Sequence, residues 1–271
     1  HFNITKESFM ISVIIPTFNA EKSIERAVES ILNQTYQDFE IIICDDCSSD
    51  RTWDILKKIS KKDKRIKIYK NEKNSKSAYT RNKAISKSRG EFIMQLDDDD
   101  YCHEDRMMKQ YKFLNSHQNF DFVGSNAFLW DFDGIYGTLK APEVPTITDL
   151  LKTSPFINPS VMFRKSALEK VGGYRVSRDT VRGQDYDLYL RLYAEGLKGY
   201  NLQENLVYYY QDKNYYNKIS WKNRVGEFKF KYKNFRNLEI TKLQYLYILK
   251  PILAIIIPKK ILTWKQLKRR T

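Results

Sequence analysis

The residues in this sequence that could do chemistry are grouped around four consecutive aspartates, Asp97 to Asp100, which follow the apolar segment EFIMQL. Like charges this close together raise one another's pKa values unless a counter-charge is present. A solvated acidic loop is one interpretation. The other is a cation site, because Mg²⁺ and Mn²⁺ bind one or two protein carboxylates together with substrate phosphates. Asp97 and Asp99 alternate at strand spacing, which predicts that both point into the same crevice.

A second acidic segment, CDDCSSD, contains Asp45, Asp46 and Asp50 and follows the apolar segment FEIIIC. A carboxylate at the end of a strand can accept a hydrogen bond from a nucleobase, whereas Ser48 and Ser49 favour a turn or a helix cap. This segment alone therefore leaves nucleotide binding and simple helix capping open.

An alternation of strands and helices is expected to position both acidic segments. Apolar runs predict strands over 10–18, 39–44, 65–70, 91–96 and 121–130, and helical periodicity predicts helices over 21–34, 51–60, 77–88 and 104–116. Buried strands of this kind form a parallel sheet that helices cover on both faces. Ligands of such sheets bind beyond the carboxyl ends of the strands, so the two acidic segments are expected to share one crevice.

A further carboxylate, Asp185, lies in GQDYDLYLRL, where the apolar residues on one face predict a helix. The helix dipole stabilises an acidic residue in the first turn. A structural role is therefore the simplest interpretation of Asp185 when it is taken alone.

Six motifs occur in order between residues 11 and 210: VIIPTFNA, CDDCSSD, TRNKA, LDDDD, NPSVMFRKSALEKVGGY and GQDYDLYLRL. This ordered set resembles the family 2 glycosyltransferases, which have the GT-A nucleotide-sugar fold. The resemblance implies an α/β fold with a Rossmann-like, mostly parallel sheet flanked by helices. It also implies an inverting transfer from a nucleotide sugar, usually a UDP-sugar, with a divalent metal, Mn²⁺ or Mg²⁺.

The resemblance implies a role for each residue that matches a family motif. The residues expected to bind the nucleotide sugar are Pro16, Thr17, Asn19, Asp46, Arg81, Asp97 and Asp98. Among them, Asp46 matches the uracil-binding position, and Arg81 lies near the diphosphate. Asp97 is expected to contact the ribose or the metal, Asp99 to bind the metal, and Asp185 to be the general base.

Two positions depart from the family pattern. Gln184 stands where the family usually has Glu before the catalytic Asp, and Asn158 stands where a His usually precedes the proline. Both residues are candidates for the acceptor side of the site. The second departure leaves acceptor recognition open.

The chemistry of glycosyl transfer agrees with these roles. A base must deprotonate the incoming hydroxyl on one face of the anomeric carbon, and a cation must stabilise the departing diphosphate on the other. Besides the expected metal ligands, Asp185 is the one catalytic carboxylate. A double displacement would need a second carboxylate as nucleophile, so one-step inversion is expected.

The net charge of +14 is located in the last fifth of the chain, because residues 213–271 contain sixteen Lys and Arg but only two acidic residues. The apolar run PILAIIIP in this segment is too short to span a bilayer. Its basic and aromatic flanks predict a basic amphipathic helical region that lies on an anionic membrane surface. The alternative is that Ile252 to Ile257 dock on the body of the protein.

Two other functions use the same features. A nucleic-acid-binding protein could use the basic tail, but no recognition motif occurs and the acidic crevice would repel phosphates, so no nucleic acid is expected as a partner. A nucleotidyltransferase also uses paired aspartates, yet IPTFNAEKS lacks the glycine-rich loop expected there.

Glycosyl transfer is therefore the favoured function. The expected acceptor is a hydroxyl of a lipid-linked glycan, and the expected process is the synthesis of a surface polysaccharide.

The expected organisation has four parts. Residues 1–9 are interpreted as an expression leader, 10–130 as the nucleotide-sugar-binding half and 131–212 as the acceptor-binding half of one GT-A domain, and 213–271 as the basic region. The chain has three cysteines and no pattern of a secretory signal. These features predict a cytoplasmic protein, peripheral at the inner face of the cell membrane.

Overall fold

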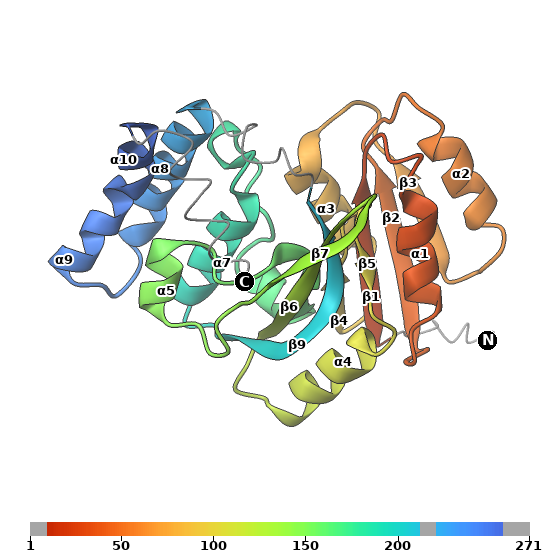
Figure 1. Ribbon diagram of the computed structural model, residues 1–271, viewed down its shortest axis with the longest axis horizontal. Helices are drawn as coiled ribbons and strands as arrows, with labels where there is room; N and C mark the ends of the chain where they lie inside the picture. Colours follow the sequence, from red (N-terminus) through yellow and green to blue (C-terminus); the bar gives the residue numbers. More distant parts are fainter. Residues whose placement is uncertain (1–9, 212–220, 257–271) are drawn as a thin grey trace, which may run out of the picture.

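The computed structural model describes residues 10–211 and 221–256, with the side chains of 255 and 256 excepted. Its first half alternates strands and helices (Figure 1). The elements of this half are β1 (Ile11–Thr17), α1 (Ile24–Leu32), β2 (Phe39–Asp45), α2 (Thr52–Ile59), β3 (Ile66–Lys70), α3 (Lys76–Lys87), β4 (Phe92–Gln95), β5 (Tyr101–Cys102) and α4 (Arg106–Ser116). Each strand and helix predicted here is confirmed, whereas the two-residue β5 was not predicted.

The second half of the chain mixes short helices with long strands. Its elements are β6 (Phe122–Asp131), β7 (Gly134–Leu139), α5 (Ile147–Lys152), η1 (Asn158–Ser160), β8 (Met162–Arg164), α6 (Lys165–Lys170), η2 (Arg178–Thr180), α7 (Gln184–Ala194), β9 (Gly199–Tyr210), α8 (Trp221–Phe235), α9 (Lys242–Tyr245), η4 (Leu246–Leu249) and α10 (Lys250–Ile256). The predicted helix at GQDYDLYLRL is confirmed as α7.

The strands of the described residues form one nine-stranded sheet in the order β3-β2-β1-β4-β8-β6-β9-β5, with β7 beside β6. Neighbours are parallel from β3 to β4. Beyond β4 the sheet is mixed, because β8 runs antiparallel to both β4 and β6. The predicted α/β fold is confirmed, and its parallel part is the part whose carboxyl ends carry both acidic segments.

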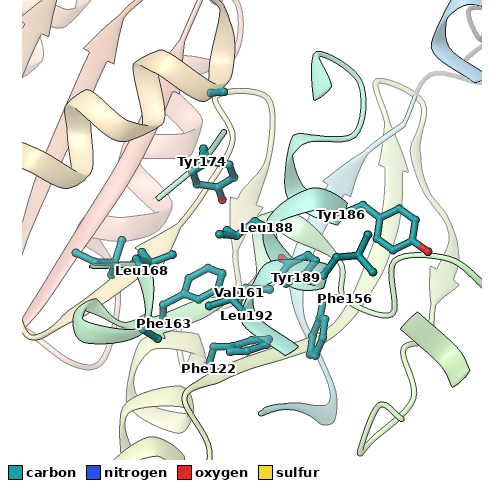
Figure 2. Packing of buried hydrophobic residues seen from close by; sticks show 14 of the residues in the cluster. Phe122, Phe156, Val161, Phe163, Leu168, Tyr174, Tyr186, Leu188, Tyr189 and Leu192 are labelled. Atoms are coloured by element: carbon teal, nitrogen blue, oxygen red, sulfur yellow. The ribbon is translucent and has the colours of Figure 1, made fainter. Parts of the chain in front are cut away.

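Helices cover both faces of the sheet, as the fully buried strands β1 and β2 require. On one face α1, α2 and α4 pack against the strands in one buried cluster. On the other face α3, α6, α7 and α8 form a second cluster, part of which Figure 2 shows. There the ring of Phe122 lies 5.8 Å from that of Tyr189 and 5.3 Å from that of Phe163, so α7 is fixed firmly against the sheet.

The helix α8 belongs to the body of the protein. Phe230 of α8 is 3% exposed and lies against Gly183, where an added Cβ would come within 2.5 Å of its ring. Asn234 Nδ2 donates a hydrogen bond to Asp187 Oδ1 at 2.8 Å. These contacts dock α8 on the beginning of α7. Among residues 10–211 and 221–256, no helix combines the length and the apolar character that crossing a bilayer requires.

Part of the predicted organisation lies outside the described residues. This holds for the leader at 1–9 and for 212–220 and 257–271 of the basic region. The division into a nucleotide-sugar half, 10–130, and an acceptor half, 131–212, stays a prediction.

Candidate active site

The aspartates after β4 lie in a turn rather than in an extended strand. β4 ends at Gln95, and Asp100 N donates to Asp97 O at 3.2 Å. The predicted strand alternation therefore does not reach these residues. Asp97 forms an ion pair with Arg81 of α3, whereas Asp99 lines a cavity of about 340 Å³ beside Arg26 of α1.

Arg81 links the aspartate turn to α7. Its side chain is only 4% exposed, and it pairs with Asp97 through Nη2 and approaches Asp185 Oδ1 to 3.8 Å through Nη1. Burial alone would lower the pKa of Arg81, but the two carboxylates raise it above its ordinary value. One buried guanidinium thus lies next to two carboxylates, one in the turn after β4 and one on α7.

Asp185 is the second residue of α7, and its side chain keeps 29% exposure. Burial and, to a smaller extent, the charge of Asp97 raise its pKa, Arg81 opposes both effects, and the resulting pKa is about 6. A carboxylate with this pKa is ionised at neutral pH yet basic enough to accept a proton. Gln184, the first residue of α7, is buried.

Asn158 lies beside Asp185 at the start of η1. With its amide nitrogen facing the neighbouring acceptors, Asn158 Nδ2 lies 3.1 Å from Asp185 Oδ1 and 2.9 Å from Gln95 Oε1. Its Oδ1 then accepts from Arg81 Nη2 at 3.1 Å. The sequence marked Asn158 as an acceptor-side candidate, but the structure brings its amide into contact with the predicted base and with Arg81.

The network includes two residues that the sequence analysis missed. Gln95 Nε2 donates to the hydroxyl of Tyr174, and the guanidinium of Arg81 lies 5.5 Å from the centre of the Tyr174 ring. Both residues are buried. A polar side chain inside the apolar strand EFIMQL was the available signal for Gln95. Tyr174 is the last residue of the motif NPSVMFRKSALEKVGGY, which was the available signal for it.

The residues expected at the nucleoside lie at the ends of β1 and β2. Pro16 and Thr17 end β1, and Asp46 N donates to Thr17 O at 2.8 Å. The carboxylate of Asp46 is 4% exposed and accepts three hydrogen bonds, listed here by donor: Asn71 Nδ2 at 2.8 Å, Ser75 N at 2.7 Å and Lys76 N at 2.8 Å. These bonds tie the turn after β2 to the start of α3.

Asn19 connects the loop after β1 to the turn after β2. Its backbone has a φ of 52°, and its Oδ1 accepts from Ser49 N at 2.9 Å. Its own N–H donates to Ser48 Oγ at 2.9 Å. Asn and Asp tolerate this left-handed conformation better than most residues. Asn19 therefore shapes the loop beside the expected nucleotide site.

Asp98 and Asp100 have partners on opposite sides of the aspartate turn. Asp98 Oδ2 accepts from Phe18 N at 2.9 Å, and Asp100 Oδ1 accepts from Tyr210 N at 2.6 Å. Burial and the charge of Asp99 raise the pKa of both groups well above the usual range. Asp100, which had no predicted role, holds the end of β9 against the turn.

The aspartate turn fits a divalent cation whose coordination includes ligand oxygens. Burial and the charge of Asp97 raise the pKa of Asp99 to about 6. Negative charge in the turn thus exceeds what Arg81 compensates, and a cation would offset the excess. Within the described residues, no group of three or more His, Cys, Asp or Glu is arranged to hold a metal. The fit is therefore to Mg²⁺ or Mn²⁺ shared with phosphate oxygens, not to an all-protein cage.

Comparison with known proteins decides the family. A sequence profile described as "Glycosyl transferase family 2" matches residues 12–172. The chain belongs to this family. The putative glycosyltransferase EpsE of Bacillus subtilis is 34% identical to this glycosyltransferase over 260 residues, which cover 96% of this chain and 94% of EpsE.

A second relative is named for a defined reaction. The UDP-Glc:alpha-D-GlcNAc-diphosphoundecaprenol beta-1,3-glucosyltransferase WfaP of Escherichia coli is 34% identical over 200 residues, covering 74% of this chain and 76% of WfaP.

Solved structures establish the GT-A fold of this glycosyltransferase. S. aureus TarS in complex with UDP-GlcNAc superposes with a TM-score of 0.72 at 20% identity, covering 91% of this chain and 73% of that chain. The mannosyltransferase PcManGT of Pyrobaculum calidifontis, in complex with GDP-Man and Mn²⁺, superposes with a TM-score of 0.66 at 14% identity, covering 96% and 80%.

Proposed function

We propose that this enzyme transfers a sugar from a UDP-sugar, with inversion, to a hydroxyl of a lipid-linked glycan acceptor in surface polysaccharide synthesis. The observation that supports this best is the position of Asp185. Its carboxylate lies 3.8 Å from Arg81, which pairs on its other side with Asp97 of the aspartate turn. The proposed base and the proposed diphosphate site are therefore both in contact with the same guanidinium group.

Asp185 accepts the proton of the acceptor hydroxyl. The hydroxyl oxygen then forms a bond to the anomeric carbon while the bond to the nucleoside diphosphate breaks. Arg81 lies where negative charge develops on the departing diphosphate and stabilises it. Because Asp185 acts as a base and no second carboxylate is assigned as nucleophile, the configuration at the anomeric carbon inverts in one step.

We assign Asp99 and Asp97 to a divalent metal, Mn²⁺ or Mg²⁺. When bound, the metal supplies a Lewis acid that neutralises the charge on the diphosphate oxygens. The raised pKa of Asp99 and the Mn²⁺ in the mannosyltransferase structure support this assignment. Asp98 holds the loop at Phe18, and we assign it to the nucleotide-sugar side together with Pro16, Thr17, Asn19, Asp46 and Arg81.

The names of similar proteins support the donor and the acceptor. TarS is recorded with UDP-GlcNAc, and WfaP is named for a UDP-sugar donor and a diphosphoundecaprenol acceptor. An acceptor of that kind is held in a membrane. We therefore place the enzyme at the cytoplasmic face of the cell membrane, attached to anionic lipid through 213–271. Asn158 and Gln184 are assigned to the acceptor side.

Calorimetric titration of UDP and GDP, with and without Mn²⁺, tests the donor and the metal together. We expect UDP to bind in a metal-dependent manner to the wild type and to Asp54→Ala, a control on α2 whose side chain is 66% exposed. We expect Asp99→Ala to lose this binding. If no nucleotide binds under any condition, the proposed function fails. Salt-sensitive RNA binding that survives Asp99→Ala would instead support the nucleic-acid-binding alternative.

A product assay separates the remaining alternative. A glycosyltransferase releases UDP from a UDP-sugar when an acceptor is present, whereas a nucleotidyltransferase releases pyrophosphate from a nucleoside triphosphate. We expect UDP release and no pyrophosphate release.

A further inference from the structure

The last described helices expose four leucines. Leu243, Leu246, Leu249 and Leu253 are 77%, 57%, 43% and 57% exposed, and they follow one another at intervals of three, three and four residues along α9, η4 and α10. These intervals place them on one side of the helical segment. Single exposed leucines are ordinary on protein surfaces, but a row of four is not. We refer to these four residues as the leucine face.

The opposite side of the same segment packs on the body. Ile248 is 5% exposed, and Tyr245 and Tyr247 pack against the cluster that contains α7. Gln244 Nε2 donates to Thr148 Oγ1 of α5 at 3.3 Å. Thr241 and Gln244 also form a capping box at the start of α9. The leucine face is therefore the outer side of an anchored segment and not the result of a frayed end.

Exposed basic side chains lie on α9, which carries part of the leucine face, and on α8, which packs against η4 and α10. Lys233, Arg236 and Lys242 are exposed, and Glu239 is the one acidic residue from 228 to 256. The sequence continues to residue 271 with six more Lys and Arg and no acidic residue. Leucines bordered by cations are complementary to a bilayer, because the apolar groups enter the acyl boundary while the cations meet anionic headgroups.

We propose that the leucine face and the basic residues beside it dock on the surface of an anionic lipid bilayer. The choice of a bilayer rests on the proposed function, since a lipid-linked acceptor requires access to a membrane. A second copy of the chain is a poorer occupant, because its own basic residues would face these at close range. The segment is proposed to lie on the membrane and not to cross it, since the apolar run PILAIIIP is too short to span a bilayer.

The docking surface is held rigidly relative to the active site. α8 precedes it and contacts the loop before α7 twice, through Phe230 against Gly183 and through Gly226, where an added Cβ would come within 2.8 Å of Asp179 O. Asn234 of α8 bonds Asp187, two residues after the predicted base. Deleting 213–271 would therefore damage the catalytic helix as well as the membrane surface. Point substitutions on the leucine face avoid this.

Vesicle flotation of the full chain tests the proposal. The vesicles contain phosphatidylcholine alone or phosphatidylcholine with 30% phosphatidylglycerol. We expect the wild type to float with the anionic vesicles and Leu246→Glu/Leu253→Glu to bind them at least tenfold more weakly. Ile135→Glu on β7, where the native side chain is 55% exposed, is the matched control and should bind as the wild type does. Lys233→Glu/Arg236→Glu should weaken binding about fivefold or more for each charge.

Wild-type flotation of the leucine variant would overturn the proposal. So would a concentration-dependent dimer in sedimentation that the same variant abolishes, because the occupant would then be a second copy. Thermal melting checks that each variant folds, and Leu243→Ser replaces any variant that does not. Flotation uses neither donor nor acceptor, and transfer to a water-soluble acceptor is measured separately. Loss of transfer with intact flotation would refute the proposed function and leave the docking surface standing.

Discussion

The two acidic turns of this glycosyltransferase contain the same residue type at the same edge of the sheet, yet their carboxylates differ in the hydrogen bonds that they accept and in the direction of their pKa shifts. In the turn after β2, Asp46 accepts three hydrogen bonds from protein donors. Asp50 accepts from Thr52 N at 2.9 Å and from Glu21 N at 3.2 Å. Burial alone would raise the pKa of Asp50, but these hydrogen bonds lower it. Charge in this turn is used to hold backbone in place.

In the turn after β4 the carboxylates are short of donors. The pKa of Asp99 is raised to about 6 by burial and by Asp97, and burial and the charge of Asp99 also raise the pKa values of Asp98 and Asp100. Arg81 is the cation paired there, and it also faces Asp185. A protein that leaves buried negative charge uncompensated loses stability, which a bound cation restores. The difference indicates that protein donors satisfy the carboxylates of the first turn, whereas the second turn holds negative charge that a bound cation would offset.

The largest effect that we expect from a substitution is on kcat, at Asp185. Asp185→Asn removes the base while keeping the size of the side chain, and we expect kcat to fall about 10²- to 10⁴-fold. UDP affinity should change less than about threefold, because Asp185 is proposed to act on the acceptor hydroxyl and not to bind the nucleotide. Asp179→Asn, at a residue whose side chain is 45% exposed on η2, is the control. Steady-state UDP release and calorimetry measure the two quantities, and near-normal turnover would remove Asp185 from the mechanism.

A substitution in the turn after β2 should lower the stability of the protein. Asp46→Asn puts an amide NH₂ where Oδ2 accepts from Lys76 N, so a part-buried N–H loses its acceptor. We expect the free energy of unfolding to fall by about 1–3 kcal/mol, measured by urea denaturation. An unchanged free energy would mean that these hydrogen bonds do not hold the turn.

The turn after β4 should respond with the opposite sign. The pKa of Asp99 is raised in the folded protein, so its ionisation favours the unfolded state once the pH exceeds the unfolded value near 3.8. In metal-free buffer at pH 7.5, Asp99→Asn should therefore raise the free energy of unfolding by about 1–2 kcal/mol. The gain should shrink between pH 6 and pH 4 and be absent below that. A loss of stability at pH 7.5 would show that Asp99 is compensated like Asp46.

Much of the fold follows from local sequence pattern, because buried parallel strands are continuous apolar runs and their helices have a 3.6-residue period. This is why each element from β1 to β4 was predicted. The mixed part of the sheet was not, since it depends on β8, three residues that pair with β4 and β6 across long stretches of chain. The turn at 97–100 was also mispredicted as extended, because four aspartates carry no turn signal as strong as glycine or proline.

The position of a candidate residue was predictable where its motif lies within one element, as with Arg81 on α3 and Asp185 on α7, and the roles of both residues stay predictions. It was not predictable where the role arises from contacts between elements. Asn158 is the example: its amide meets Asp185, Gln95 and Arg81, which come from three different elements. Residue type and spacing do not reveal contacts between side chains of different elements.

The smallest expected effect separates the two possible roles of Asn158. Its Nδ2 lies 3.1 Å from Asp185 Oδ1 and stabilises the ionised base, and Arg81, Asp97, Tyr174 and Tyr189 are the other titratable groups that act on Asp185. In the wild type, kcat/KM should decrease tenfold per unit as the pH falls below about 6, because the base is then protonated. Asn158→Ala should move this limb about one unit upward, which would reduce kcat/KM about twofold at pH 7 and about tenfold well below pH 6, with donor KM unchanged.

Asn82→Ala is the matched control, since Asn82 is an asparagine next to Arg81 in the sequence that bonds the backbone of Tyr174, at 2.7 and 2.8 Å, and not the base. It should lower the melting temperature and leave the acidic limb where it is. An Asn158→Ala enzyme with an unmoved limb and a raised acceptor KM would instead assign Asn158 to acceptor binding. In that case Arg81, and not Asn158, would stabilise the ionised carboxylate of Asp185. Arg81 would then be shared between Asp185 and Asp97, which would leave the turn after β4 with even less compensating charge than the turn after β2.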